Sequence, residues 1–519
     1  MDRGPRSRRL RTCRRLSRTT ARLAGTPPRR SKEIHMTTQQ EAAADVAERP
    51  KRLSGKLGTL DIVFTVLAFN APMSVFIGYL TVIIGAGNGF GAPITYFACG
   101  ALLLIFAVGF TSMSRHMRNP GAFYAYVTAG LGRPAGLGAS FVAVISYYFI
   151  LLGGYALGGV GLGAFVHDVL GGPELPWWLW VGVLMAVAGT LGYFNINISA
   201  KVLLVFMAAE VVLIVAYDTV VFATGGAEGF TAAPLAFDNI LSGNIGIALL
   251  FGIVCYSGFE ATAVFREEAR DPDRTIPRAT YIAVLFLALA YGISTWAVIV
   301  GVGPSTVLEE SAADPAGTVL ASVATYLGKL GSDVVTVLLV TSVFAANLAT
   351  HNVTSRYAYS LAVDGIFPKF LSKVHGKHVS PYAASLVTSV IGALFLTVLV
   401  LLGLEGNAIY SVLIGIGGYS LIMLLVMTSV AVIWYFWRRP EIQLSYWKRL
   451  IAPALATMGL LVALYLATIH VADMIGGDQV LATAIMLTFY IAFVGGIVVA
   501  YVLRAKKPAI YERIGRSVD

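Results

Sequence analysis

From Leu60 onward the chain consists of long apolar stretches that contain almost no charged residues. Each is about 20 residues long, the length at which an α-helix crosses a bilayer core of roughly 30 Å. Backbone groups in lipid must be satisfied within the protein, and strands of a membrane barrel alternate over only about ten residues. The sequence therefore predicts an all-α polytopic membrane protein. Twelve runs are found, near residues 60–84, 90–113, 136–166, 177–195, 199–224, 241–265, 278–303, 331–360, 381–403, 408–437, 451–470 and 480–503.

Composition agrees with a chain embedded in lipid. Hydrophobic residues make up 57% of the 519 residues and charged residues 13%, whereas a soluble protein carries about 25% charged residues. Cys13, Cys99 and Cys255 are scattered without the spacing of a disulfide framework or a metal site. No nucleophile or metal-ligand set is recognisable, and the polar residues are too isolated to line a channel. We therefore expect no enzyme activity, no cofactor and no metal.

The basic charge of the chain lies at its N-terminus. Residues 1–35 hold eleven arginines and Lys32 against Asp2 and Glu33, which equals the formal net charge of +10 of the whole chain. No basic surface for nucleic acid is expected elsewhere. This segment has the composition of a transit peptide or a twin-arginine signal, but the apolar region of such signals does not follow it. The alternative is a disordered or untranslated leader, with the working start at Met36.

The positions of the basic residues predict the topology. With the region before Leu60 in the cytoplasm and twelve spans, Lys329 is the one lysine or arginine after Met36 that falls outside. Basic residues concentrate in cytoplasmic loops of membrane proteins. We therefore expect both termini in the cytoplasm, in tails formed by residues 1–56 and 504–519.

Two of the runs contain helix-breaking residues beside polar ones. The first run reads VLAFNAPMSVFIGYL, with Pro72 in its middle, and the sixth reads FGIVCYSGFEATAVF, with Gly258 followed by Glu260. Proline removes a helix donor and glycine tolerates a left-handed backbone. Paired interruptions in corresponding spans of two halves indicate the binding site of a transporter, because irregular backbone in a membrane lines a cavity or is buried in protein. A single break in one span is more often only a kink.

Three segments carry a resemblance to a known family. They are GFEATAVFREEARDPDRTIPRA after the sixth-span break, RHMRNPGAFYAYV before the third span, and SRYAYSLAVDGIFPKFLSKVHGKHVSP after the eighth. From about residue 55 to 505 the chain resembles the amino acid–polyamine–organocation (APC) transporters. The resemblance implies a secondary carrier in the plasma membrane that alternates between outward-open and inward-open states.

The resemblance also implies the five-plus-five inverted-repeat fold named after the leucine transporter, in which helices 1 and 6 are broken. Residues 57–224 would form the first repeat and residues 240–437 the second. Helices 11 and 12, within residues 450–503, would lie outside the repeats and pack at the rim or form a homodimer.

The two breaks and their neighbours supply the candidate site residues. Unwound backbone exposes N–H groups to an anionic part of a substrate and carbonyl groups to a cationic part. Candidate substrate-binding residues are Asn70, Ala71, Met73, Ser74, Cys255, Tyr256, Ser257, Gly258, Phe259 and Tyr148. Candidate coupling or gating residues are Pro72, Glu210 and Glu260. Glu260 would accept a proton or brace the unwound part of the sixth span.

The first break departs from the family pattern. Many members have a Gly-x-Gly turn whose N–H groups hold a carboxylate, whereas this chain has Asn70-Ala71-Pro72-Met73-Ser74, and proline has no N–H. Amino acids are the substrates that the resemblance implies, and this departure keeps a polyamine or an ethanolamine-like amine as the alternative. A substrate sensor on the same fold is the alternative that is not a transporter.

Glu210 lies within the fifth run, where an ionisable side chain costs at least about 2.5 kcal/mol on insertion scales. Several sodium-independent relatives have a lysine at the matching position. We expect Glu210 to couple transport to H⁺, with Na⁺ as the alternative ion. A purely structural hydrogen bond to span 1 or span 8 is the competing interpretation.

Overall fold

The computed structural model describes residues 57–117, 123–194, 200–376, 378 and 380–515, which are helical apart from their connections. This confirms the all-α membrane fold class. The α-helices are α2 (Thr59–Asn70), α3 (Pro72–Gly78), α4 (Leu80–Ala86), α5 (Ala92–Ser114), α6 (Phe123–Leu131), α7 (Arg133–Ala164), α8 (Trp177–Tyr193), α9 (Ala200–Thr224), α10 (Phe237–Ile240), α11 (Ile245–Val254), α12 (Pro272–Val302), α13 (Val307–Ala313), α14 (Pro315–Val363), α15 (Tyr382–Leu401), α16 (Gly406–Trp437), α17 (Ala452–Met474), α18 (Gln479–Lys506) and α19 (Pro508–Tyr511). Short 3₁₀ segments are η1 (Gly89–Gly91), η3 (Ala233–Leu235), η4 (Phe259–Glu267) and η5 (Lys369–Ser372), and single π-turns are η2 (Phe165–Val169) and η6 (Trp447–Ile451).

The number of spans agrees with the prediction except at one position. Within the described residues, 11 helical segments are long and apolar enough to cross a membrane. The predicted run at 177–195 corresponds to α8, an apolar helix of 17 residues. The exact count of twelve therefore stays a prediction.

The helix that contains the eighth run begins earlier than its apolar pattern indicates. The run starts at 331, but α14 begins at Pro315 and kinks at Gly328, whose φ is 71°. The Asp314 side chain accepts the Gly317 N–H and caps the helix, and proline is favoured at the first helical position. This amphipathic extension and the short α13 were not predicted, because hydropathy alone detects only the apolar part.

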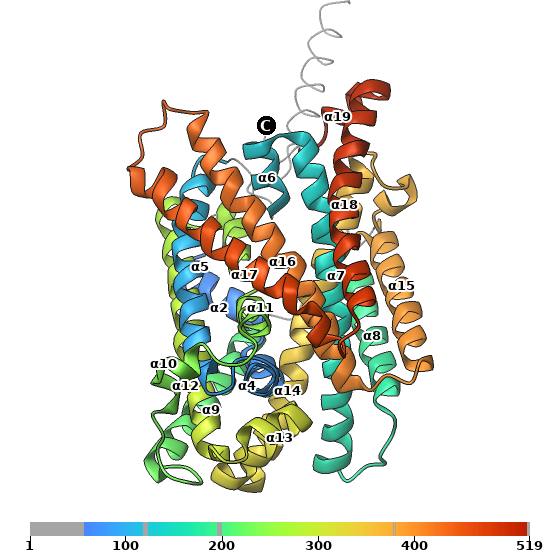
Figure 1. The fold of residues 1–519 in the computed structure, drawn as a ribbon. Coiled ribbons are helices and arrows are strands. Elements are labelled where there is room, and N and C mark those ends of the chain that lie inside the picture. The colour runs from blue at the N-terminus through green and yellow to red at the C-terminus, as the bar shows by residue number, and fades with distance from the viewer. Residues whose placement is uncertain (1–56, 118–122, 195–199, 377, 379, 516–519) are drawn as a thin grey trace, which may run out of the picture. The chain divides into compact units, whose positions relative to one another are not determined.

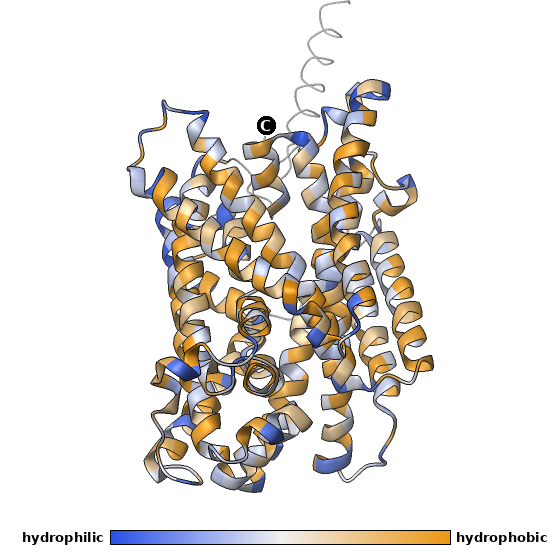
Figure 2. Cartoon of the chain, in the orientation of Figure 1, coloured by the Kyte–Doolittle hydropathy of each residue, from blue (hydrophilic) through white to orange (hydrophobic). Residues whose placement is uncertain are grey.

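Burial separates the interior helices from those on the periphery. Within an apolar stretch of 18 residues in each span, 78% of the residues are buried in the spans that contain α11 and α16, against 17% in α18. In Figure 1, α2, α4 and α11 lie toward the middle of the bundle, and α15 and α18 lie at one side. Figure 2 shows hydrophobic residues along the outward faces of these outer helices. Apolar residues on an outward face are expected of a protein whose solvent is lipid.

Glycines of α7 allow its neighbours to approach closely, as the segment GGYALGGVGLG predicts. A Cβ at Gly159 would lie 2.4 Å from Val181 of α8, and one at Gly153 would lie 2.8 Å from Ile414 of α16. Small residues at such crossings let helix backbones meet in a membrane. The last two spans pack outside this centre, α17 against α5, α11 and α16, and α18 mainly against α7.

Candidate functional site

The first break consists of a single residue. Ala71 has the left-handed dihedrals φ 54° and ψ 71°, and Pro72 begins α3 immediately after it. The residue before a proline is disfavoured in helical conformation, while proline suits the first turn of a new helix. Pro72 offers no N–H and the Met73 N–H donates to Glu210, so the Ala68 and Phe69 carbonyls lose their regular helical donors.

The second break is longer. Helix α11 ends at Val254, and the 3₁₀ segment η4 begins at Phe259 after a connection that includes Gly258 at φ 105°. A 3₁₀ segment of nine residues is unusual, because such runs rarely exceed three or four. The connection therefore consists of residues 255–258, and the half-helix that follows it is a 3₁₀ segment rather than an α-helix.

Asn70 connects the two breaks. Its Nδ2 donates to the Cys255 carbonyl at 2.6 Å and to the Ser257 carbonyl at 3.0 Å, and its Oδ1 accepts a hydrogen bond from the Tyr291 hydroxyl of α12. These carbonyls belong to the irregular backbone that follows α11. One side chain of α2 therefore satisfies polar groups of the sixth span and holds the two breaks together.

Glu260 holds the second break to α7. One carboxylate oxygen accepts the Gly258 N–H at 2.9 Å, and the other accepts the Tyr147 hydroxyl, also at 2.9 Å. The side chain is buried, with 4% exposed. These are the contacts of a brace between the joint and the third span. They leave Glu260 behind Tyr147 and outside the lining of the cavity between the breaks.

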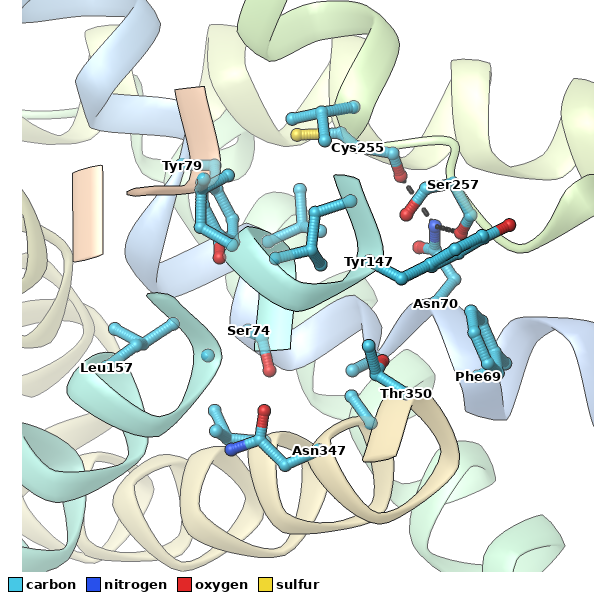
Figure 3. Close-up of a pocket in the computed structure, with 18 residues that line it drawn as sticks. Phe69, Asn70, Ser74, Tyr79, Tyr147, Leu157, Cys255, Ser257, Asn347 and Thr350 are labelled. Atoms are coloured by element: carbon cyan, nitrogen blue, oxygen red, sulfur yellow. Dashed lines mark hydrogen bonds between the residues drawn. The ribbon is translucent and has the colours of Figure 1, made fainter. Parts of the chain in front are cut away.

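A cavity of about 70 Å³ lies between the breaks, α7, α14 and α16 (Figure 3). Polar side chains on its wall come from the first span, α7, the sixth-span joint and α14. They are Asn70, Ser74, Tyr79, Tyr147, Ser257, Asn347 and Thr350. The remaining wall is apolar or small, and no lysine, arginine, aspartate or glutamate is among the lining residues. A mostly apolar pocket with a few convergent polar groups is the usual form of a small-molecule site.

Two of the lining groups lack hydrogen-bond partners among the described residues. They are the Ser74 hydroxyl and Nδ2 of Asn347, and both are buried. Figure 3 shows the Ser74 side chain extending toward Asn347 of α14, whose Oδ1 is turned toward Ser74 and whose Nδ2 is turned away from it. Buried polar groups are seldom unsatisfied in native proteins, so these atoms mark a place where a polar ligand fits.

The predicted substrate residues fall into two groups. Those that line the cavity are Asn70, Ala71, Ser74, Cys255 and Ser257. Those that do not are Met73, Tyr256, Gly258, Phe259 and Tyr148. In the second group, the Tyr256 hydroxyl donates to the Tyr96 carbonyl, Phe259 packs edge-on against Phe106, and the Tyr148 hydroxyl donates to the Thr388 carbonyl.

Sequence reasoning omitted most of the wall contributed by α7 and α14. On α7 the lining residues are Tyr147, Ile150, Gly154 and Leu157, and on α14 they are Val343, Ala346, Asn347 and Thr350. Both sets follow the spacing of one helical face. The signal on α14 was available, because Asn347 and Thr350 are polar residues on one face of an apolar run.

Glu210 of α9 connects three spans. Its Oε2 accepts the Met73 N–H of α3 at 3.0 Å and the Ser342 hydroxyl of α14 at 3.1 Å. Hydrogen bonds of the kind named in the competing interpretation are therefore present to both span 1 and span 8. The side chain also lines a separate cavity of about 160 Å³, together with Pro72 and Phe206. Hence Glu210 lies beside the first break rather than in the cavity between the breaks.

A substitution at Gly258 tests whether the second break requires this backbone. A Cβ would lie 2.4 Å from Cδ1 of Phe69, and positive φ costs about 1–3 kcal/mol for a non-glycine residue. We expect Gly258→Ala to lower the melting temperature of the purified protein and to reduce uptake at least tenfold. Gly182→Ala is the control, because a Cβ there meets nothing within 4 Å. Equal melting temperatures for the two variants would contradict the strain argument.

Comparison with known proteins gives the family. A sequence model of the amino acid permease family matches residues 61–510. The chain is 26% identical over 335 residues to the low-affinity putrescine importer PlaP of Escherichia coli (strain K12), covering 63% of this chain and 71% of the relative. It is 25% identical over 361 residues to the branched-chain amino acid permease BcaP of Lactococcus lactis subsp. cremoris (strain MG1363), covering 64% and 75%.

A third relative is the lysine-specific permease LysP of Escherichia coli (strain K12), 23% identical over 239 residues that cover 43% of this chain and 48% of the relative. These matches confirm the resemblance to APC transporters, and with it the function of a membrane transporter. Because the family match extends over most of the chain, this protein belongs to the amino acid permease family.

Proposed function

We propose that this permease moves small amino acids across the plasma membrane by alternating access around the cavity between the two helix breaks, with H⁺ as the coupling ion. The observation that carries the choice of substrate is the pair of unpartnered groups on the cavity wall, Ser74 Oγ and Asn347 Nδ2.

The chemistry of these groups favours a carboxylate. Asn347 Nδ2 has two N–H donors and no acceptor capacity, so only an acceptor satisfies it. The Ser74 hydroxyl can donate to a second acceptor atom. A carboxylate has two oxygen atoms that accept such hydrogen bonds, whereas a fully protonated polyamine offers only donors. A carboxylate-bearing substrate therefore satisfies groups that a polyamine leaves unpaired.

The amine end of an amino acid finds acceptors at the first break. Phe69 lines the cavity, and its carbonyl has lost the Met73 N–H to Glu210. Carbonyl groups at an interrupted helix are suitable partners for a cation. The ring of Tyr147 on the opposite helix also lines the cavity and supplies an aromatic face.

The volume limits the size of the substrate. A cavity of about 70 Å³ is small among ligand pockets, which commonly enclose about 300–1,000 Å³, so it favours the smallest amino acids. Alanine has six non-hydrogen atoms and serine seven. Larger amino acids require the wall formed by Leu157, Val343 and Ile414 to move.

A carboxylate-free amine is the second candidate. The Escherichia coli relative PlaP imports putrescine, and Glu260 lies directly behind Tyr147, which lines the cavity. A negative charge at that position favours an amine on the inner side of the ring. This candidate leaves Asn347 Nδ2 without an acceptor, so we rank it second.

The orientation in the membrane follows from the basic residues. With both termini in the cytoplasm, Lys329 is the one lysine or arginine after Met36 that lies outside. This asymmetry supports insertion in the plasma membrane with cytoplasmic tails.

A matched pair of solutes tests the proposed substrate. Ethanolamine is serine without its carboxylate, so the pair isolates that group. We expect purified protein in proteoliposomes to take up serine and alanine, and to bind ethanolamine about 10–150-fold more weakly, from about 1.5–3 kcal/mol for hydrogen bonds to a charged group. Asn347→Ala should weaken the binding of serine by a similar factor and leave the binding of ethanolamine unchanged.

Thr397→Ala, on an exposed face of α15, is the control and should leave both affinities unchanged. Uptake of ethanolamine and putrescine without uptake of serine would overturn the amino acid proposal in favour of the second candidate.

A further inference from the structure

A second buried carboxylate lies on α9, away from the cavity between the breaks. Asp218 has 8% of its surface exposed, and its Oδ2 accepts the Ser294 hydroxyl of α12 at 2.8 Å. Its Oδ1 is buried and has no hydrogen-bond partner among the described residues. An ionisable residue within a membrane span is costly, and it indicates a functional site unless its partner is evident.

Asp218 lines a cavity of about 420 Å³ between α9 and α12. The rest of the lining is apolar apart from Thr219, and includes the rings of Phe222 and Phe286. Leu289 and Val215 on its wall are 46% and 55% exposed, as expected where a cavity faces lipid. No lysine, arginine or histidine is among its lining residues.

The cavity thus combines a large apolar volume with one unsatisfied carboxylate oxygen. A neutral apolar occupant leaves Oδ1 unpaired, and an inorganic cation leaves the apolar wall unfilled. A molecule with a protonated amine at the end of an apolar body satisfies both, since its N–H groups donate to Oδ1 and its body packs against the aromatic rings.

We propose that this cavity is a second binding site, which takes a hydrophobic primary amine from the bilayer. The ammonium group pairs with Asp218 and the apolar part lies against Phe222 and Phe286. Pro72, the first residue of α3, also lines the cavity, so an occupant contacts the broken first span from outside the cavity between the breaks.

The test uses two probes of nearly equal shape, 4-phenylbutylamine and 4-phenylbutanol. We measure the binding of each to the purified full-length protein in lipid nanodiscs by the concentration dependence of its melting temperature. We expect the amine to stabilise the protein and the alcohol to bind at least about tenfold more weakly. Asp218→Asn should weaken amine binding at least about tenfold, because close charge pairs at interfaces contribute about 1.5 kcal/mol or more.

Two further variants keep the test decisive. Ala290→Phe fills the cavity without changing Asp218, and should also remove amine binding. Asn347→Ala alters only the cavity between the breaks, and should leave amine binding unchanged. Equal binding of amine and alcohol, amine binding that survives both Asp218→Asn and Ala290→Phe, or no stabilisation by the amine would overturn the proposal.

Discussion

Asn70→Ala should reduce uptake at least about 100-fold while the protein remains folded in the membrane. The variant removes the two donors that Nδ2 gives to the Cys255 and Ser257 carbonyls, and the acceptor of the Tyr291 hydroxyl. Each buried polar group left unsatisfied costs about 1–3 kcal/mol. At the lower limit of this range, the three groups together cost about 3 kcal/mol. That free energy corresponds to a change of slightly more than 100-fold in an equilibrium constant.

The position of these groups is the reason to expect an effect on transport beyond stability. Both carbonyls belong to the joint of the sixth span, and Asn70 is the last residue of α2, directly before the first break. Without this side chain the two breaks lose their direct connection. Alternating access requires the broken spans to change conformation together around one site.

Asn70→Asp sharpens the test because it preserves shape and removes the donors. A carboxylate there faces two carbonyl oxygens, so we expect a loss at least as large as that of the alanine variant. Uptake in proteoliposomes and melting temperature are measured in parallel, with Asn407→Ala of α16 as the control. Wild-type uptake by both Asn70 variants would show that the connection between the breaks is dispensable.

The sequence located the two breaks because each depends on a residue with a fixed backbone preference. Pro72 cannot continue a helix and glycine tolerates a positive φ, so both positions were evident from the sequence. In the structure Gly258 has φ 105°. The extent of each break was less predictable. The first span resumes after Ala71 alone, whereas the sixth passes into a 3₁₀ segment of nine residues, near whose start Glu260 accepts the Tyr147 hydroxyl.

The cavity wall was harder to predict, because it depends on the rotation of each helix about its axis. Tyr147 and Tyr148 are adjacent in sequence, but neighbouring side chains on a helix point about 100° apart. Tyr147 lines the cavity and Tyr148 turns to α15. Hydropathy does not fix this rotation in a helix that is apolar on nearly all sides, as α7 is.

Glu210 shows the reverse case, in which the chemistry was predictable and the geometry added detail. A polar partner on span 1 or span 8 was the competing interpretation, and the structure provides one on each, a backbone N–H and a hydroxyl. The backbone partner exists only because Pro72 disrupts the regular ladder and turns the Met73 N–H away from the Phe69 carbonyl. The break and the carboxylate therefore belong to one structural unit.

Glu210→Gln should abolish accumulation driven by a pH gradient and preserve exchange. Both hydrogen bonds end on Oε2, and the single carbonyl oxygen of glutamine can accept both of them. The variant therefore keeps the link among α3, α9 and α14 and removes only the capacity to take up a proton. A purely structural carboxylate predicts no difference between the variant and the wild type.

The expected size of the effect follows from the gradient itself. With the outside one pH unit more acidic than the inside, one H⁺ per substrate supplies about 1.4 kcal/mol, which supports about tenfold accumulation by the wild-type protein. The variant should bring the substrate concentrations inside and outside to about the same value, and it should still exchange labelled for unlabelled substrate. Thr397→Ala, on an exposed face of α15, is the control and should retain the tenfold accumulation. Accumulation by Glu210→Gln at the wild-type level would show that Glu210 only joins the three spans, and that any proton is carried elsewhere.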